Sequence, residues 1–399
     1  MTVLGEHPQP VTEHADSGGA ASGTGPLAVP QQHRGAWRPE LGAGERLFAQ
    51  IGPLALENDA VLEDVTIAYE TWGELDADGG NAVLVLHALT GDSHVRGDAG
   101  PAHPSPGWWE EMVGPGRPID TDRFHVIAPN VLGGCQGSTG PSSPAPDGRP
   151  YGSRFPALTT RDQVAAERRL REHLGIDRWA LVIGGSMGGM RAVEWAVSHP
   201  DEVERLGVIA SSARATADQI AWNSTQIESI RLDPDFHGGD YYGRDTRPDA
   251  GLGIARRIAH TTYRTAAELE DRFANLPQAE EDPLDGHGRH RVTSYLDHHA
   301  DKLSRRFDAN SYVTLARSMS THDVGRGRGG LAAALERVTA RTLVVAIDSD
   351  RLFPASLSEE IARHVPRADL HIASSPIGHD AFLLAHPGLS GWIAALMAD

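Results

Sequence analysis

The sequence is poor in cysteine and has no long apolar run. Cys135 is the only cysteine among the 399 residues, so an intrachain disulfide cannot form, as is typical of proteins from a reducing compartment. No segment approaches the roughly 18 apolar residues that cross a bilayer. Residues 1–40 lack the basic stretch followed by an apolar run that marks a secretory signal. We therefore expect a cytoplasmic protein without a membrane span.

Positive charge is also scarce. The chain has 36 Lys and Arg against 54 Asp and Glu, which gives a formal net charge of −18. Nucleic-acid-binding proteins usually present a basic face, so this balance argues against a nucleic-acid partner. Apolar residues make up 40% of the chain, enough for an ordinary globular core. Residues 1–45, rich in Gly, Pro, Ala, His and Gln at their start, are expected to form a mobile tail.

Short β-rich runs alternate with helical patterns along most of the chain. AVLVLH (82–87) and WALVI (179–183) are almost entirely apolar, as expected of strands buried on both faces of a sheet. Alternating strands and helices indicate right-handed βαβ units and a parallel sheet. The predicted strands are Val61–Tyr69, Ala82–His87, Phe124–Pro129, Trp179–Ile183, Leu206–Ala210, Thr342–Ile347 and Asp369–Ala373, and the predicted helices among them are Thr160–Leu174 and Arg191–His199.

The strand pattern stops in the middle of the chain, where the sequence becomes helical and more polar. The segments 260–273 and 295–307 are amphipathic, with apolar residues repeating at helical spacing. A helical insert within a βα pattern indicates a lid over the active end of the sheet. We expect an α/β catalytic domain made of residues 46–212 and 336–399, and a helical lid domain made of residues 213–335.

The clearest chemical signal is the turn GGSMG at residues 184–188. It follows a buried strand and precedes a helix, which is the context of a nucleophile elbow, with Ser186 as the nucleophile. A Gly-rich strand–helix turn can instead bind a phosphate, but this turn lacks the lysine of a P-loop. The motif therefore predicts an α/β-hydrolase fold, a mostly parallel central sheet flanked by helices. The backbone N–H groups of Met187 and Leu89, the latter just after an early strand, are the expected oxyanion donors.

A serine nucleophile needs a base and an acid that orients the base. In this fold they follow the serine in the order acid, then histidine. His379 lies in the loop after the last predicted strand, where the base belongs. Asp348 and Asp350 both follow the preceding strand, and position alone does not choose between them.

Several longer motifs resemble the homoserine O-acyltransferases of methionine biosynthesis. The resemblance covers about residues 47–394. The motifs that carry it are LHALTGDSH (86–94), APNVLGGCQGSTGPSS (128–143), GGSMGGM (184–190), IARRIAHTTYR (254–264), DSDRLFP (348–354) and IGHDAF (377–382).

The resemblance implies a reaction and a set of roles. It implies ping-pong acyl transfer from acyl-CoA to the hydroxyl of L-homoserine, and it selects Asp350 as the acid. It also implies that Arg256, Tyr263 and Asp380 contact homoserine. A planar guanidinium suits the substrate carboxylate, and a carboxylate suits its ammonium group. Arg257 is an adjacent alternative to Arg256.

The resemblance allows more than one acyl donor and more than one acyl acceptor. The stretch GGCQG (133–137) is more typical of the acetyl branch, which implies acetyl-CoA as co-substrate, with succinyl-CoA as the alternative. Serine is an alternative acceptor, because one methylene is worth only about 1–3 kcal/mol of discrimination. A serine esterase of the same fold is a further alternative. We expect no bound cofactor and no metal, and the resemblance implies a homodimer formed through the lid.

Overall fold

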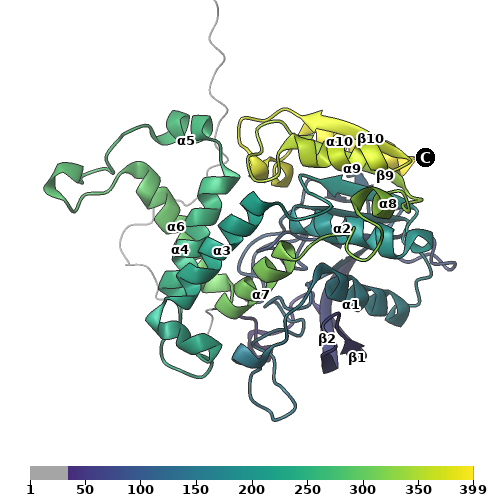
Figure 1. The fold of residues 1–399 in the computed structure, drawn as a ribbon, viewed down its shortest axis with the longest axis horizontal. Helices are drawn as coiled ribbons and strands as arrows, with labels where there is room; N and C mark the ends of the chain where they lie inside the picture. Colours follow the sequence, from purple (N-terminus) through teal and green to yellow (C-terminus); the bar gives the residue numbers. More distant parts are fainter. Residues whose placement is uncertain (1–34, 399) are drawn as a thin grey trace, which may run out of the picture. The chain divides into compact units, whose positions relative to one another are not determined.

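The computed structural model describes residues 35–398, which are organised around one eight-stranded sheet (Figure 1). The spatial order of its strands is β1-β2-β6-β3-β7-β8-β9-β10. These strands are β1 (Leu47–Ala55), β2 (Val61–Trp72), β3 (Ala82–Leu86), β6 (His125–Pro129), β7 (Leu181–Gly185), β8 (Arg205–Ile209), β9 (Arg341–Ile347) and β10 (Ala368–Ala373). Two short strands, β4 (Val113–Gly114) and β5 (Ile119–Asp120), pair separately.

The sheet is parallel from β6 through β10 and antiparallel at its other edge. β1 pairs antiparallel with β2, and β2 pairs antiparallel with β6. The remaining pairings are parallel. The mostly parallel sheet is therefore confirmed. Strand β1 was not predicted, because Gly52 and Pro53 interrupt its pattern, and its register with β2 shifts at Gly52.

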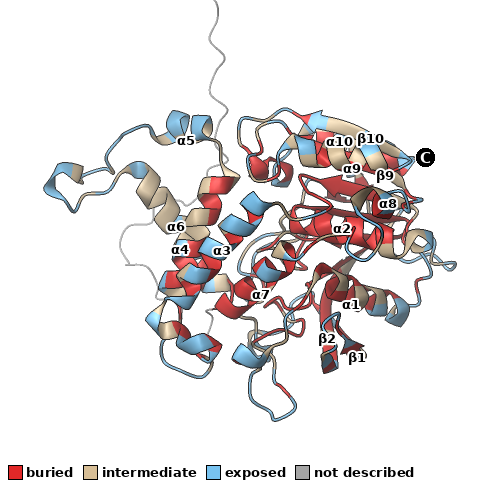
Figure 2. Ribbon diagram, in the orientation of Figure 1, coloured by how far each residue is buried: buried red, intermediate tan, exposed pale blue. Residues whose placement is uncertain are grey.

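Burial on both faces explains the continuous apolar runs of the central strands. Along β3, Leu84 and Leu86 belong to one core with residues of α1 and α2, whereas Val83 and Val85 belong to the opposite core with residues of α10. Successive strand residues point to opposite faces, so each strand supplies both cores. Figure 2 shows the central strands and α2 as buried and α5 as largely exposed.

Among the described residues, four α-helices lie outside the segment between β8 and β9: α1 (Thr160–His173), α2 (Met187–Ser198), α9 (Ala355–His364) and α10 (Pro387–Ala398). Six lie between β8 and β9, and the last of these, α8 (Leu331–Leu335), leads back to the sheet and packs against α9. The insertion holds α3 (Ala217–Arg231), α4 (Asp249–Tyr263), α5 (Ala266–Phe273), α6 (Arg291–Arg306) and α7 (Ala309–Ser320). Within residues 35–398, no helix has both the length and the apolar character of a membrane span.

The structure describes every residue of the helical insertion, and none of them belongs to a strand of the eight-stranded sheet. Its helices gather beside the sheet in Figure 1, where α3, α4 and α6 lie next to one another. The amphipathic segment 260–273 is divided between two helices, α4 and α5. Arg264 is extended, and the Thr265 hydroxyl accepts from the Glu268 N–H (3.0 Å), so Thr265 begins a new helix, α5.

The predicted N-terminal tail covers residues 1–45, and residues 1–34 lie outside the described part of the chain. Residues 35–45 contact the folded body. The Gly35 N–H donates to the Arg305 carbonyl (3.1 Å), and the Trp37 N–H donates to the Cys135 carbonyl (2.8 Å). The folded body therefore already includes Gly35, rather than starting at residue 46.

Candidate active site

Ser186 occupies the sharp turn between β7 and α2. Its backbone angles, φ 56° and ψ −124°, are costly for a non-glycine residue. Two hydrogen bonds hold this conformation: the Ser186 N–H donates to the Ile209 carbonyl (3.0 Å), and the Ser211 hydroxyl donates to the Ser186 carbonyl (2.7 Å). The strained turn presents the serine hydroxyl at the carboxyl end of the sheet, as a nucleophile elbow does.

The glycines around Ser186 allow α2 to pack directly against the ends of the strands. A Cβ added to Gly184 would lie 2.4 Å from the carbonyl carbon of Gly188. A Cβ added to Gly188 would lie 2.0 Å from the carbonyl oxygen of Leu86, the last residue of β3. No side chain fits at either distance. The close approach places the loop that follows β3 next to the beginning of α2.

Ser186, His379 and Asp350 form one hydrogen-bonded chain. The Ser186 hydroxyl oxygen lies 2.9 Å from His379 Nε2, and His379 Nδ1 lies 2.6 Å from Asp350 Oδ2. With a proton on Nδ1 held by the carboxylate, Nε2 is free to accept the serine proton. The structure thus brings together three residues that are 164 and 29 positions apart in sequence (350 − 186 and 379 − 350).

The geometry also separates the two candidate acids. Asp350 is buried, and its second oxygen, Oδ1, accepts from the N–H groups of Leu352 and Phe353 (2.8 Å each). Asp348 is exposed and accepts from the Ser375 N–H instead (3.0 Å). The first arrangement orients a histidine, and the second ties one loop to the next. Within the described residues, Asp350 is the acid that reaches His379.

Aromatic rings hold the His379 imidazole in place. Phe353 stacks on it, with centroids 5.0 Å apart and planes at 18°, and Phe382 meets it nearly edge-on. Burial lowers the pKa of His379, but the charge and hydrogen bond of Asp350 outweigh burial and raise that pKa above its ordinary value. A higher pKa makes the imidazole a stronger base when it is neutral.

Two backbone N–H groups, those of Met187 and Leu89, belong to segments next to Ser186. Met187 is the first residue of α2, directly after Ser186, and Leu89 lies in the loop after β3 and lines the same pocket as Ser186. Within residues 35–398, neither N–H group donates a hydrogen bond. Buried N–H groups without acceptors are rare, and at this position they suit the charge that develops in acyl transfer.

The pocket at Ser186 is walled by the helical insertion. Tyr263 of α4 and Met319 of α7 line it together with Ser186. Three amides of α3 also line it: Gln219, Asn223 and Gln226. The insertion therefore forms part of the wall around the serine, and the polar α3 side chains give the pocket a wall that suits a hydrophilic substrate.

Two arginines converge on the loop that carries Leu89. Arg256 donates to the Thr90 hydroxyl (3.3 Å), and Arg306 donates to the Thr90 carbonyl (2.7 Å). Burial, followed by the charge of Arg256, lowers the pKa of Arg306, so the two cations are close enough to repel each other. Neither forms an ion pair with a carboxylate in the described part of the chain. Two such cations at Thr90, next to the pocket-lining Leu89, are suited to an anionic substrate group.

The remaining predicted contacts lie near the triad. The Tyr263 ring is 5.6 Å from the His379 ring and 5.7 Å from the Arg256 guanidinium carbon. Asp380 follows His379 directly, and its Oδ2 lies 3.4 Å from Arg264 Nε, a pairing that the sequence did not indicate. Arg257, the alternative to Arg256, is occupied by an ion pair with Asp297.

Known proteins share the fold and most of the length of this chain. A family model described as alpha/beta hydrolase fold matches residues 81–385. A homoserine O-acetyltransferase of Thermobifida fusca is 58% identical over 368 residues, covering 92% of this chain and 97% of that protein. One from Mycolicibacterium smegmatis is 57% identical, covering 86% and 90%.

The chain belongs to the homoserine O-acetyltransferase family.

Solved structures place the family within a wider group. A homoserine O-acetyltransferase from Bacillus anthracis matches with a TM-score of 0.82 and 26% identity, covering 89% of this chain and 97% of that one. The esterase E22 matches with a TM-score of 0.81 and 27% identity, covering 88% and 99%. The α/β-hydrolase fold predicted from the elbow motif is confirmed. The same scaffold thus serves acyl transfer and ester hydrolysis.

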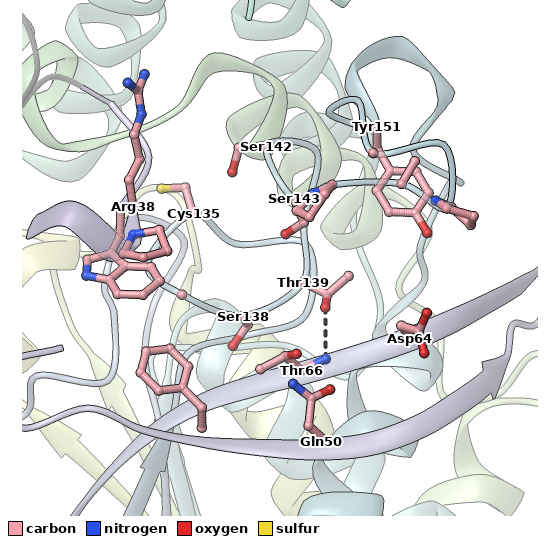
Figure 3. Close-up of a pocket in the computed structure, with 18 residues that line it drawn as sticks. Arg38, Gln50, Asp64, Thr66, Cys135, Ser138, Thr139, Ser142, Ser143 and Tyr151 are labelled. Atoms are coloured by element: carbon pink, nitrogen blue, oxygen red, sulfur yellow. Dashed lines mark hydrogen bonds between the residues drawn. The ribbon is translucent and has the colours of Figure 1, made fainter. Parts of the chain in front are cut away.

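Cys135 belongs to one of the family-like motifs but not to the site around Ser186. It lines a second pocket, between β1–β2 and the loop 133–151, which Figure 3 shows with Thr139 accepting from the Thr66 N–H (2.9 Å). None of Ser186, Asp350 and His379 lines that pocket. Burial raises the pKa of the Cys135 thiol, which keeps it protonated and a poor nucleophile. This environment suits a small structural residue of the loop.

Sequence reasoning missed Arg306, Thr90 and the α3 amides in this member of the family. Arg306 is the second arginine of a pair at the end of an amphipathic helix, a position where cations commonly serve the helix dipole. Gln219 doubles as part of a capping box with Thr216. Because these residues also have local roles in their own helices, the sequence does not indicate that they lie near the site at Ser186. Their position becomes clear only in the folded structure.

Proposed function

We propose that this protein transfers an acetyl group from acetyl-CoA to the hydroxyl of L-homoserine in methionine biosynthesis. The main observation is the Ser186–His379–Asp350 hydrogen-bonded chain beneath a lid with two arginines, Arg256 and Arg306, that pair with no carboxylate among residues 35–398. The triad supplies acyl transfer through serine, and the cations supply a place for an amino-acid carboxylate. Full-length relatives named homoserine O-acetyltransferase support the same reaction.

In the first half-reaction, His379 Nε2 takes the proton of Ser186 while the serine oxygen attacks the thioester carbonyl. The N–H groups of Leu89 and Met187 stabilise the oxyanion that forms. When the carbon–sulfur bond breaks, the imidazolium returns the proton to the departing CoA thiolate. Acetyl-Ser186 and free CoA result.

In the second half-reaction, homoserine replaces CoA. His379 takes the proton of the homoserine hydroxyl, whose oxygen attacks the acetyl-serine. The same two N–H groups stabilise the second oxyanion, and the proton passes to the departing Ser186 oxygen. The lid has to favour homoserine over water, because a solvent molecule in the same place hydrolyses the intermediate.

Homoserine binding is the step that the lid residues serve. Arg256 supplies a planar cation for the carboxylate, with Arg306 adding positive charge beside it. Asp380 supplies an anion for the ammonium group, and Tyr263 packs between the arginine and the triad. Arg264 now forms an ion pair with Asp380. When the ammonium group of homoserine binds Asp380, Arg264 has to leave this carboxylate or share it.

Replacing Arg256 tests this part of the proposal. We expect Arg256→Met to raise the KM for homoserine by about 10- to 100-fold, the equivalent of losing one hydrogen bond to a charged group. The rate at which acetyl-CoA acetylates Ser186 should change much less. Arg257→Met is the matched control, because Arg257 pairs with Asp297. Steady-state and rapid-quench kinetics separate the two steps, and equal effects of both variants would contradict the assignment.

The alternatives differ in donor, acceptor or both. Succinyl-CoA brings a second carboxylate to the arginines, serine is one methylene shorter than homoserine, and an esterase needs only water. The purified protein should release thiol from acetyl-CoA rapidly only when homoserine is present, and mass spectrometry should find O-acetylhomoserine. Faster thiol release from succinyl-CoA, or release that is as fast without an amino acid, would overturn the proposal.

Two further parts of the proposal concern the oligomeric state of the protein and its location in the cell. We propose a homodimer formed through the lid, where Ile254 and Leu284 are exposed apolar residues (50% and 94%). The molecular mass of the particle in solution tests this part. A cytoplasmic location accords with the metabolites that the reaction uses.

A further inference from the structure

Three buried metal-binding side chains meet away from the Ser186 pocket. Glu70 lies on β2, whereas His94 and His103 lie in the long loop after β3. Their exposed fractions are 0%, 4% and 6%. One donor atom from each lies within 4.8 Å of the other two. None of the three lines the pocket at Ser186.

Two of these side chains are held in fixed orientations. His94 Nδ1 lies 2.9 Å from Glu70 Oε2, and His94 Nε2 lies 3.2 Å from the Asp98 carbonyl oxygen. The Ser93 hydroxyl donates to Glu70 Oε1 (2.6 Å). Metal-binding histidines typically give their second N–H to a backbone carbonyl, and metal-binding carboxylates accept hydrogen bonds from neighbouring groups. His94 and Glu70 already have such partners.

His103 has no such partner. Neither ring nitrogen forms a hydrogen bond within the described residues, although the side chain is almost fully buried. Its Nε2 is 3.8 Å from Glu70 Oε1, and its ring stacks on that of His94 with centroids 3.8 Å apart. Burial, with help from the charge of Arg46, lowers the pKa of His103 to about 4. The imidazole is therefore neutral near pH 7, with a lone pair available and a free-energy cost for leaving it unused.

We propose that Glu70, His94 and His103 bind a divalent transition-metal ion of the Zn²⁺ type. Two imidazole nitrogens and one carboxylate oxygen are a common donor set for Zn²⁺, which completes its tetrahedron with water. Ligand atoms about 2.0–2.1 Å from a tetrahedral ion lie roughly 3.3 Å apart. The donor atoms of the three side chains now lie within 4.8 Å of one another, so binding the ion requires them to move closer together by about 1 Å or a little more. The ion replaces the proton that His94 Nδ1 shares with Glu70.

This ion is structural, and it is separate from the acetyl-transfer chemistry. It joins β2 to the loop that begins at His87 and contains Leu89, the proposed oxyanion donor. The sequence positions 70, 94 and 103 match no short metal-binding spacing, so the fold alone brings them together. The negative charge of Asp92 raises the pKa of both histidines, although at His103 its effect is smaller than that of Arg46.

Zinc binding to the full-length protein tests the site. After treatment with EDTA, calorimetric titration with ZnCl₂ should show about one tight equivalent, with a rise in Tm of about 2 °C or more. His103→Ala should lose both responses. His173→Ala, which removes an exposed histidine at the end of α1, should keep both. Absence of uptake by the wild-type protein, or uptake unchanged in His103→Ala, overturns the proposal.

A second measurement uses the wild-type protein alone, in case His103→Ala does not fold. Crystals soaked in ZnCl₂ should show an anomalous scattering peak at the zinc edge among Glu70, His94 and His103. Peaks confined to surface histidines overturn the site. The outcome is independent of whether homoserine or another acceptor is the substrate, so this test and that of the proposed function fail separately.

Discussion

Ser186→Ala should lower kcat by roughly 10,000-fold or more and abolish the acetyl-enzyme. The hydroxyl oxygen carries the acetyl group between the two half-reactions. The buried Cys135 thiol does not replace it, because it lines a different pocket and its pKa is raised. Rapid mixing with acetyl-CoA should give a burst of CoA from the wild-type protein and none from the variant. Intact-mass measurement should find an added acetyl group only in the wild type.

Ser212→Ala is a suitable control for this experiment. Ser212 is also buried and lies near the end of β8, but its hydroxyl has no hydrogen-bond partner within residues 35–398. The control should retain the burst and most of the turnover. If Ser186→Ala still acquires an acetyl group from acetyl-CoA, Ser186 is not the nucleophile.

The parallel sheet was predictable because its strands are buried on both faces. Runs such as 82–87 and 342–347 are almost entirely apolar, and in the structure they are β3 and β9, with ends shifted by a residue. Strand β1 was missed because Gly52 and Pro53 break its pattern, although pairing with β2 overrides the interruption. The division of 260–273 at Arg264 was missed because amphipathic spacing continues across Thr265, whose capping role depends on an extended backbone.

The triad was largely predictable because the order of its members follows the order of the strands. Each member lies just beyond a strand end, so locating the strands located Ser186 and His379. The choice of Asp350 over Asp348 needed the family resemblance, since both follow β9. The three-dimensional contact that decides it, Asp350 to His379 Nδ1, joins loops that sequence spacing alone does not relate.

The lid contacts were less accessible from the sequence. Arg306 lies 50 residues after Arg256 (306 − 256), and the two meet only because α4 packs against α6. The ion pair of Asp380 with Arg264 depends in the same way on the lid docking beside the loop of His379. Charged side chains on a helix surface usually face solvent, so their sequence alone carries no sign of a shared site.

Asp350→Asn should lower kcat by roughly 10,000-fold while the protein keeps its fold. The asparagine oxygen can still accept from the Leu352 and Phe353 N–H groups. Its NH₂ group then faces His379 Nδ1 and favours the tautomer with the proton on Nε2. That tautomer cannot accept the proton of Ser186, and no carboxylate stabilises the imidazolium.

The pH profile distinguishes this effect from simple misfolding. Asp350 raises the pKa of His379 against the opposing effect of burial, so its charge favours the protonated form. Without that charge the pKa falls, and the neutral imidazole persists to lower pH. The residual activity of Asp350→Asn should therefore decline at a lower pH than that of the wild type. A profile with the wild-type acid limb would contradict the role of Asp350.

Asp348→Asn is the matched control for Asp350→Asn. Asp348 follows the same strand, but it is exposed and accepts from the Ser375 N–H rather than from His379. We expect its kcat to stay within about threefold of the wild-type value, because an exposed hydrogen bond contributes little. Two substitutions of the same kind, two residues apart, thus separate the acid that orients the base from a carboxylate that only connects two loops.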